Sequence, residues 1–90
     1  NTSGANAIRN TGIYLQGVGS GTVNNNTIAN FEAATSETDR GIWLATGTSN
    51  VNVTNNTISN MVLTATASSP IGINITTGVA NSNVVVSQNN

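Results

Sequence analysis

An internal repeat constrains the fold of this chain more than any other feature. A glycine followed by an apolar, a variable and an apolar residue occurs three times, as GIYL at 12–15, GIWL at 41–44 and GINI at 72–75. A second block, VNNNTIANF at 23–31, aligns without a gap with VTNNTISNM at 53–61, and a weaker third copy begins at Val84. The coil starts at Gly12, Gly41 and Gly72 are separated by steps of 29 and 31, a period typical of solenoids and propellers.

The spacing inside each repeat predicts β-strands. Ile13 and Leu15 are two positions apart, and the same apolar alternation recurs in the later copies, as in a strand with one buried face. β-branched residues dominate these runs, and the clusters of Gly, Asn and Ser between them are typical of turns. Each repeat is therefore expected to hold a strand, a glycine-containing turn, a second strand, an Asn-rich corner and a short third strand near 27–28 or 57–58. No helix of useful length is expected.

Like strands recur in the same order and direction, so we expect successive repeats to stack as coils with equivalent strands parallel and about 4.8 Å apart. The expected fold class is all-β, a parallel β-helix of about three coils. Stacking would create three aliphatic ladders and one asparagine ladder. Their members are Ile13, Ile42 and Ile73; Leu15, Leu44 and Ile75; Val23, Val53 and Val86; and Asn26, Asn56 and Asn89. Hydrogen bonds between side-chain amides explain the asparagine ladder without a ligand.

These residues also carry a family resemblance. The strings GIYL…VNNNTIANF and GIWL…VNVTNNTISNM resemble the GIxL…NTIxNN pattern of the parallel β-helix repeat family, over about residues 12–90. The resemblance implies a right-handed β-helix of the kind found in secreted and cell-surface microbial proteins. It leaves the activity open, because the family includes sugar-processing enzymes, metal-insertion accessory proteins and adhesive surface proteins. The coils here are longer than the family's usual low twenties, with the additional residues in loops at 32–40 and 62–70.

The composition excludes several kinds of chemistry. Without histidine or cysteine, neither a Ser-His-Asp or Cys-His catalytic set nor a zinc site is expected. Two arginines and a net charge of −1 do not suit a phosphate backbone, so nucleic acid is not an expected partner. No apolar run approaches the length of a transmembrane helix, so membrane insertion is not expected either.

The acidic residues offer little for catalysis. Glu32, Glu37 and Asp39 are the only three, and all precede Arg40 in one loop. We expect this loop to be solvated, with Arg40 pairing with Asp39 or Glu37, and none of the acids to lie on a stacked strand. A flexible loop positions a general acid and base poorly. Glu37 and Asp39 are close enough in sequence to contact one Ca²⁺, but alone they supply too few oxygen ligands. The chain by itself is therefore expected not to be an enzyme, and to use no metal or cofactor.

Two aromatic residues are the other candidate site. If Ile13 and Leu15 point inward, Tyr14 points outward, and Trp43 lies over it in the next coil. Two exposed rings could form a platform for a sugar ring, with neighbouring Asn and Thr side chains as hydrogen-bond donors. The third member of the row, Asn74, interrupts this platform. Ordinary packing of aromatic side chains across strands is the other interpretation.

The overall composition suggests where such a chain works. Asn, Thr and Ser supply 40 of the 90 residues and lysine is absent, which is unusual for a cytosolic protein. An extracellular or cell-surface location is therefore expected. Five Asn-x-Ser/Thr sequons are attributed to the composition; they begin at Asn1, Asn25, Asn52, Asn55 and Asn74.

The repeat also predicts how the chain is used. A stack of coils has two open ends with unpaired strand edges, which promote association unless they are covered. If a second copy followed the first, Gly12 of the second copy would come 30 residues after Gly72 of the first. The three intervals of 29, 31 and 30 residues between coil starts then add up to the chain length of 90. Residues 1–90 are therefore expected to form one three-coil module of a longer fibre, filament or adhesin. The modules would associate head to tail, or with neighbouring repeats in one chain. The alternative is a carbohydrate-binding or carbohydrate-active β-helix fragment that contacts surface glycans.

Overall fold

The computed structural model describes residues 8, 10–33, 38–63 and 69–90, and it confirms an all-β parallel β-helix of about three coils. The described residues contain no helix. The strands are β1 (Thr11–Leu15), β2 (Gly21–Asn24), β3 (Thr27–Ala33), β4 (Arg40–Leu44), β5 (Val51–Thr54), β6 (Thr57–Leu63), β7 (Ile71–Ile75) and β8 (Val85–Ser87).

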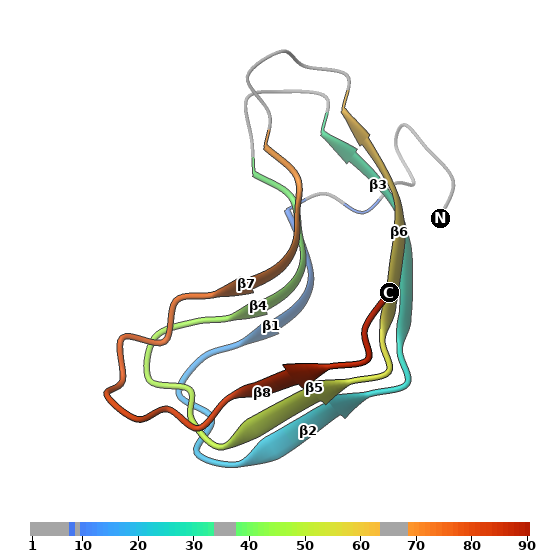
Figure 1. Ribbon diagram of the computed structural model, residues 1–90. Helices are drawn as coiled ribbons and strands as arrows, with labels where there is room; N and C mark the ends of the chain where they lie inside the picture. The colour runs from blue at the N-terminus through green and yellow to red at the C-terminus, as the bar shows by residue number, and fades with distance from the viewer. Residues whose placement is uncertain (1–7, 9, 34–37, 64–68) are drawn as a thin grey trace.

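These strands form three sheets in which all neighbours are parallel. The sheet orders are β1-β4-β7, β2-β5-β8 and β3-β6. Figure 1 shows the coils one behind another, with β1-β4-β7 facing β2-β5-β8 and the third sheet joining them at one side. Each strand therefore pairs with its equivalent in the next coil, and the side chains of like positions form rows along the stack.

The core lies between the three sheets and is centred on the middle coil. Register places Ile42 between Ile13 and Ile73, Leu44 between Leu15 and Ile75, and Val53 between Val23 and Val86. The three middle residues are fully buried, and Phe31 and Ile28 contribute from the third sheet. Ile13, Leu15 and Ile73 are half-buried and Ile75 and Val86 are exposed, because the outer coils have a neighbouring coil on one side only.

Left-handed backbone at asparagine forms the corners of each coil. Asn25 and Asn55, which follow β2 and β5, have φ of 58° and 55°, and Gln88 has φ of 56° after β8. Asparagine adopts this conformation more readily than most residues because its short polar side chain bonds to nearby backbone. The Asn-rich segments therefore turn the chain abruptly from the second sheet into the third.

The third strand is longer than the sequence analysis predicted, because the short strand near 27–28 extends to seven residues in β3 and also in β6. Ile28 and Phe31 are both buried although they are three positions apart, which a regular strand does not allow. Asn30 and Asn60, with φ of 66° and 54°, each add one residue to the regular alternation of the strand. The residue that follows each of them therefore faces the core again. The amide of Asn60 donates to Asn30 Oδ1 at 2.7 Å, so the two irregularities stack.

Close approach of neighbouring strands explains the glycine at the start of the first two coils. A Cβ on Gly12 would lie 2.6 Å from Ile28 Cγ2 and 2.8 Å from the carbonyl oxygen of Gly41. A Cβ on Gly41 would lie 2.6 Å from the carbonyl oxygen of Gly72 and 2.8 Å from Ile58 Cγ2. The same position in the last coil is open, because no heavy atom of the described residues lies within 4 Å of a Cβ on Gly72.

Candidate functional site

The aromatic pair lies on the outer face of the first sheet. Tyr14 and Trp43 are in register on β1 and β4, and Asn74 follows on β7. Their ring centroids are 4.9 Å apart, but the ring planes are inclined at 63°, in an edge-to-face arrangement. Tyr14 is 50% exposed, whereas Trp43 is half-buried. The two rings therefore contact one another and do not present a single flat surface to a ligand.

The polar groups of both aromatic side chains form hydrogen bonds with neighbouring side chains. The indole N–H of Trp43 donates to Thr76 Oγ1 at 2.8 Å, and the hydroxyl of Tyr14 donates to Gln16 Oε1 at 2.7 Å. The guanidinium carbon of Arg40 lies 4.0 Å from the centre of the Trp43 ring, in a cation–π contact. A sugar at this place would have to share the Trp43 ring with both Arg40 and Tyr14. These contacts are those of a packed surface cluster.

Asp39 is placed differently from the solvated loop that the sequence analysis predicted. Its side chain is buried, with 1% exposed, and Oδ1 accepts the backbone N–H of Asn10 at 2.9 Å. Its carbonyl oxygen accepts the N–H of Ile71, so Asp39 joins the starts of all three coils. The prediction was wrong because a carboxylate that accepts a backbone N–H of the preceding coil can be buried, and sequence proximity to Arg40 does not reveal this.

Glu32 also departs from its predicted position. It lies within β3, in register with Val62 of β6, and so it is on a stacked strand after all.

Arg40, expected to pair with an acid, donates to the carbonyl oxygen of Thr38 at 3.4 Å and covers Trp43. Glu37 lies outside the described residues. Within the described part of the chain, Asp39 Oδ2 and Arg40 Nε are buried without a hydrogen-bond partner.

The asparagine ladder is the most extensive polar arrangement between coils. Oδ1 of Asn56 accepts the backbone N–H of Asn26 at 3.0 Å and its side-chain amide at 2.9 Å. Oδ1 of Asn89 accepts the same two groups of Asn56, at 3.0 and 2.9 Å. Asn56 is fully buried, and its amide also donates to the carbonyl oxygen of Val23 at 2.9 Å. All bonds between the ladder side chains run in one direction, from each coil to the oxygen of the next.

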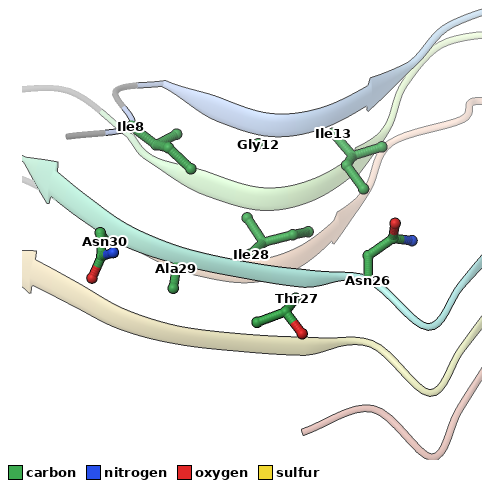
Figure 2. Close-up of a pocket in the computed structure, with 8 residues that line it drawn as sticks. All are labelled: Ile8, Gly12, Ile13, Asn26, Thr27, Ile28, Ala29 and Asn30. Carbon is green, nitrogen blue, oxygen red and sulfur yellow. The ribbon is translucent and has the colours of Figure 1, made fainter. Parts of the chain in front are cut away.

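The two open ends of the stack carry the described cavities. We call the end formed by Ile8, β1 and β2 the head face, and the end formed by Asn90, β6, β7 and β8 the tail face. The head face has a cavity of about 480 Å³ lined by Gly12, Ile13, Ile28 and neighbouring residues of β3, as Figure 2 shows. The tail face has one of about 320 Å³, lined by Ile58, Met61, Gly72, Ile73, Asn89 and Asn90. Both cavities lie between the first and third sheets, where an additional coil would place its own apolar side chains.

No protein-family model, no curated protein and no solved structure matches this chain. The described residues contain no group of three or more His, Cys, Asp or Glu side chains that could hold a metal ion. Within the same part of the chain, no helix has the length and apolarity needed to cross a membrane.

Proposed function

We propose that this chain is a structural module of an extracellular or cell-surface fibre, filament or adhesin, in which each end of the stack is covered by a further coil. One observation carries the proposal: two ladder positions that are buried in the middle coil are exposed at the tail face. Leu44 is 0% exposed and its neighbour Ile75 is 45% exposed; Val53 is 0% exposed and its neighbour Val86 is 42% exposed. A coil over the tail face would bury these side chains as Leu44 and Val53 are buried.

Physical chemistry favours such stacking. Burial of apolar surface stabilises by roughly 25 cal/mol per Å². The unpaired edges of β7 and β8 offer backbone groups that a parallel strand could satisfy, as β4 and β5 already do on their other side. The chain carries only five charged residues and a net charge of −1, so little repulsion opposes the association of copies.

The same proposal places the chain in the parallel β-helix repeat family and makes it non-catalytic. Ile8 bridges Phe31, so the coil that runs from one to the other is shorter than the later coils and falls in the low-twenties range that the resemblance implies. The longer coils differ by the insertions after β3 and β6. Asp39 is held in the interior by backbone groups and Glu32 lies on β3, an arrangement better suited to joining coils than to acid–base chemistry. The low charge and the asparagine- and threonine-rich composition support an extracellular location.

A chain that carries two copies of the 90 residues in tandem tests the stacking proposal. We expect a single cooperative unfolding transition with a midpoint about 2–8 °C above that of one copy, since about 1–2 kcal/mol of added stability has that effect in a cooperative unit of this size. The control is Ile75→Asp in the first copy, which should be tolerated in the single chain and should remove the gain in the tandem chain. Two independent transitions at the midpoint of one copy would contradict the proposal.

The carbohydrate-binding alternative makes a different prediction, which fluorescence can test because Trp43 is the single tryptophan. With its ring covered by Arg40 and Tyr14, we expect no saturable change in emission on titration with polysaccharides, and no retention on a glycan array. Trp43→Ala serves as the control for nonspecific retention. Saturable quenching, array binding that is lost in Trp43→Ala, or cleavage of any polysaccharide would favour the alternative.

A further inference from the structure

We propose that the tail face of one copy binds the head face of a second copy, and that the partner's Ile8 side chain enters the cavity between Gly72 and Met61. This inference rests on the proposed function, because it identifies what covers the tail face. It is carried by four features of the described residues: the stagger of the sheets, the position of Gly72, the direction of the asparagine ladder and the lack of charge at both cavities.

The stagger of the sheets makes the two faces complementary. Among the described residues, the first and second sheets each have three strands and the third has β3 and β6. Ile8 bridges Phe31 at the head edge of the third sheet, and Asn90 pairs with the start of β6 at its tail edge. Asn90 accepts the N–H of Ile58 at 2.7 Å and donates to the carbonyl oxygen of Asn56 at 2.8 Å, so it begins a strand beside β6.

A second copy continues this arrangement without a gap. When its β1 and β2 pair with β7 and β8, its Ile8 reaches the row of Phe31 and Met61, because Ile8 already precedes Phe31 in that row. The third sheet then gains the strand position that the last coil lacks. Figure 2 shows Ile8 and Ile28 among the residues that line the head cavity, between β3 and the first sheet.

Gly72 provides a separate indication of an occupant at this cavity. Gly12 and Gly41 lie where a Cβ would collide with the third strand and with the following coil. A Cβ on Gly72 meets nothing within 4 Å among the described residues, so the single copy itself does not require glycine there. In the docked pair, the β1 strand of the second copy would lie against Gly72 as β4 lies against Gly12 and β7 against Gly41, and a Cβ on Gly72 would then meet a backbone carbonyl oxygen as it would in the first two coils.

The polar ladder has matching ends. Asn26 and Asn56 each donate their backbone and side-chain N–H groups to the Oδ1 of the next coil. The side-chain amide of Asn89 donates instead to the carbonyl oxygens of Val53 and Ser87, so its backbone N–H is the group that can continue the ladder. Asn26 has its amide oxygen on the head side, as Figure 2 shows. In the docked pair, the partner's Asn26 Oδ1 would accept the backbone N–H of Asn89, as Asn89 Oδ1 accepts that of Asn56. A head-to-head pair would oppose two amide oxygens.

No charged side chain lines either cavity. The lining residues are apolar, glycine, threonine or asparagine. Desolvation of these side chains therefore carries no cost for a buried charge. The same unlike faces repeat on every copy, so the contact is heterologous and extends into a filament.

The test uses one variant that blocks each face. Gly72→Leu places a side chain in the open tail cavity and is expected to fold like the parent, because a Cβ at this position meets no described heavy atom within 4 Å. Ile8→Asp blocks the head face. The parent is expected to form filaments in electron micrographs and large species in sedimentation velocity, and each variant should weaken association about 10- to 100-fold. An equimolar mixture of the two variants should form dimers, since one intact tail and one intact head remain.

The controls separate folding from assembly. Circular dichroism and thermal unfolding establish that each variant is folded, and Ile8→Asn replaces Ile8→Asp if the latter is not. Asn52→Asp, on the exposed outer face of β5, should assemble like the parent. A parent that is monomeric at several hundred micromolar, Gly72→Leu that assembles normally, or a mixture that yields no dimers would overturn the inference. If the tandem chain is nevertheless stabilised, the proposed function stands and only the association of free copies fails.

Discussion

Replacing Gly41 by alanine is expected to lower the free energy of unfolding by about 3 kcal/mol, as severe overpacking does in protein cores. The added Cβ would lie 2.6 Å from the carbonyl oxygen of Gly72 and 2.8 Å from Ile58 Cγ2 and Cδ1. The carbonyl oxygen belongs to β7, whose backbone is fixed by pairing with β4, so it cannot move without disturbing that sheet. Urea unfolding followed by circular dichroism measures the loss.

Gly72→Ala is the matched control, because Gly72 occupies the same position in the last coil and its Cβ would meet no described atom within 4 Å. We expect it to be neutral or to stabilise by about 0.4–1 kcal/mol through the entropy of the unfolded chain. Equal losses in the two variants would show that glycine is needed for its backbone conformation and not for close approach. In the tandem chain, Gly72→Ala in the first copy should become as damaging as Gly41→Ala.

The rows of aliphatic side chains could be deduced from the sequence because two periods act together. Alternation by two assigns Ile42 and Leu44 to one face of a strand, and the longer internal repeat assigns them to the rows of Ile13 and Leu15. A change of register by one residue would expose the whole apolar set, so the pattern leaves one arrangement. This reasoning gave the fold class and the position of the asparagine ladder.

Features that depend on a single backbone angle could not be deduced in this way. Asn30 and Asn60 look like the other asparagines, yet their left-handed backbone adds a residue to the third strand and places Phe31 in the core. The spacing of three between Ile28 and Phe31 was the available signal, since it departs from strict alternation. Ile8 gave no signal at all, because its place at the sheet edge comes from pairing with Phe31.

In the candidate site, too, the contacts that follow from the repeat could be predicted, and those that depend on single side chains could not. The sequence brought Tyr14 and Trp43 together correctly in register, because both follow from the ladder. The inclination of 63° between their rings and the place of Arg40 over Trp43 depend on side-chain rotamers, which repeat alignment does not constrain. Burial of Asp39 was missed for a related reason: its donor, the N–H of Asn10, belongs to the preceding coil and is far away in the sequence.

Replacing Asn56 by leucine is expected to lower the free energy of unfolding by about 3 kcal/mol or more, because each buried polar group left without a partner costs about 1–3 kcal/mol. The leucine fills a similar volume but leaves the N–H of Asn26 and the carbonyl oxygen of Val23 without their partners at 3.0 and 2.9 Å. The lost bonds themselves are worth less than this desolvation cost. Chemical denaturation gives the change, and loss of the native circular dichroism signal at room temperature is the extreme outcome.

The direction of the ladder makes Asn26→Leu the informative control. Asn26 donates to Asn56 through both its backbone and its side chain, and the backbone bond survives the substitution. Only the side-chain amide is lost, and its other bond is to the carbonyl oxygen of Asn24 on the exposed side. We therefore expect a loss of about 1 kcal/mol, well below that of Asn56→Leu. Similar losses for the two variants would mean that the ladder acts through packing alone, and the polarity on which head-to-tail docking depends would have no energetic basis.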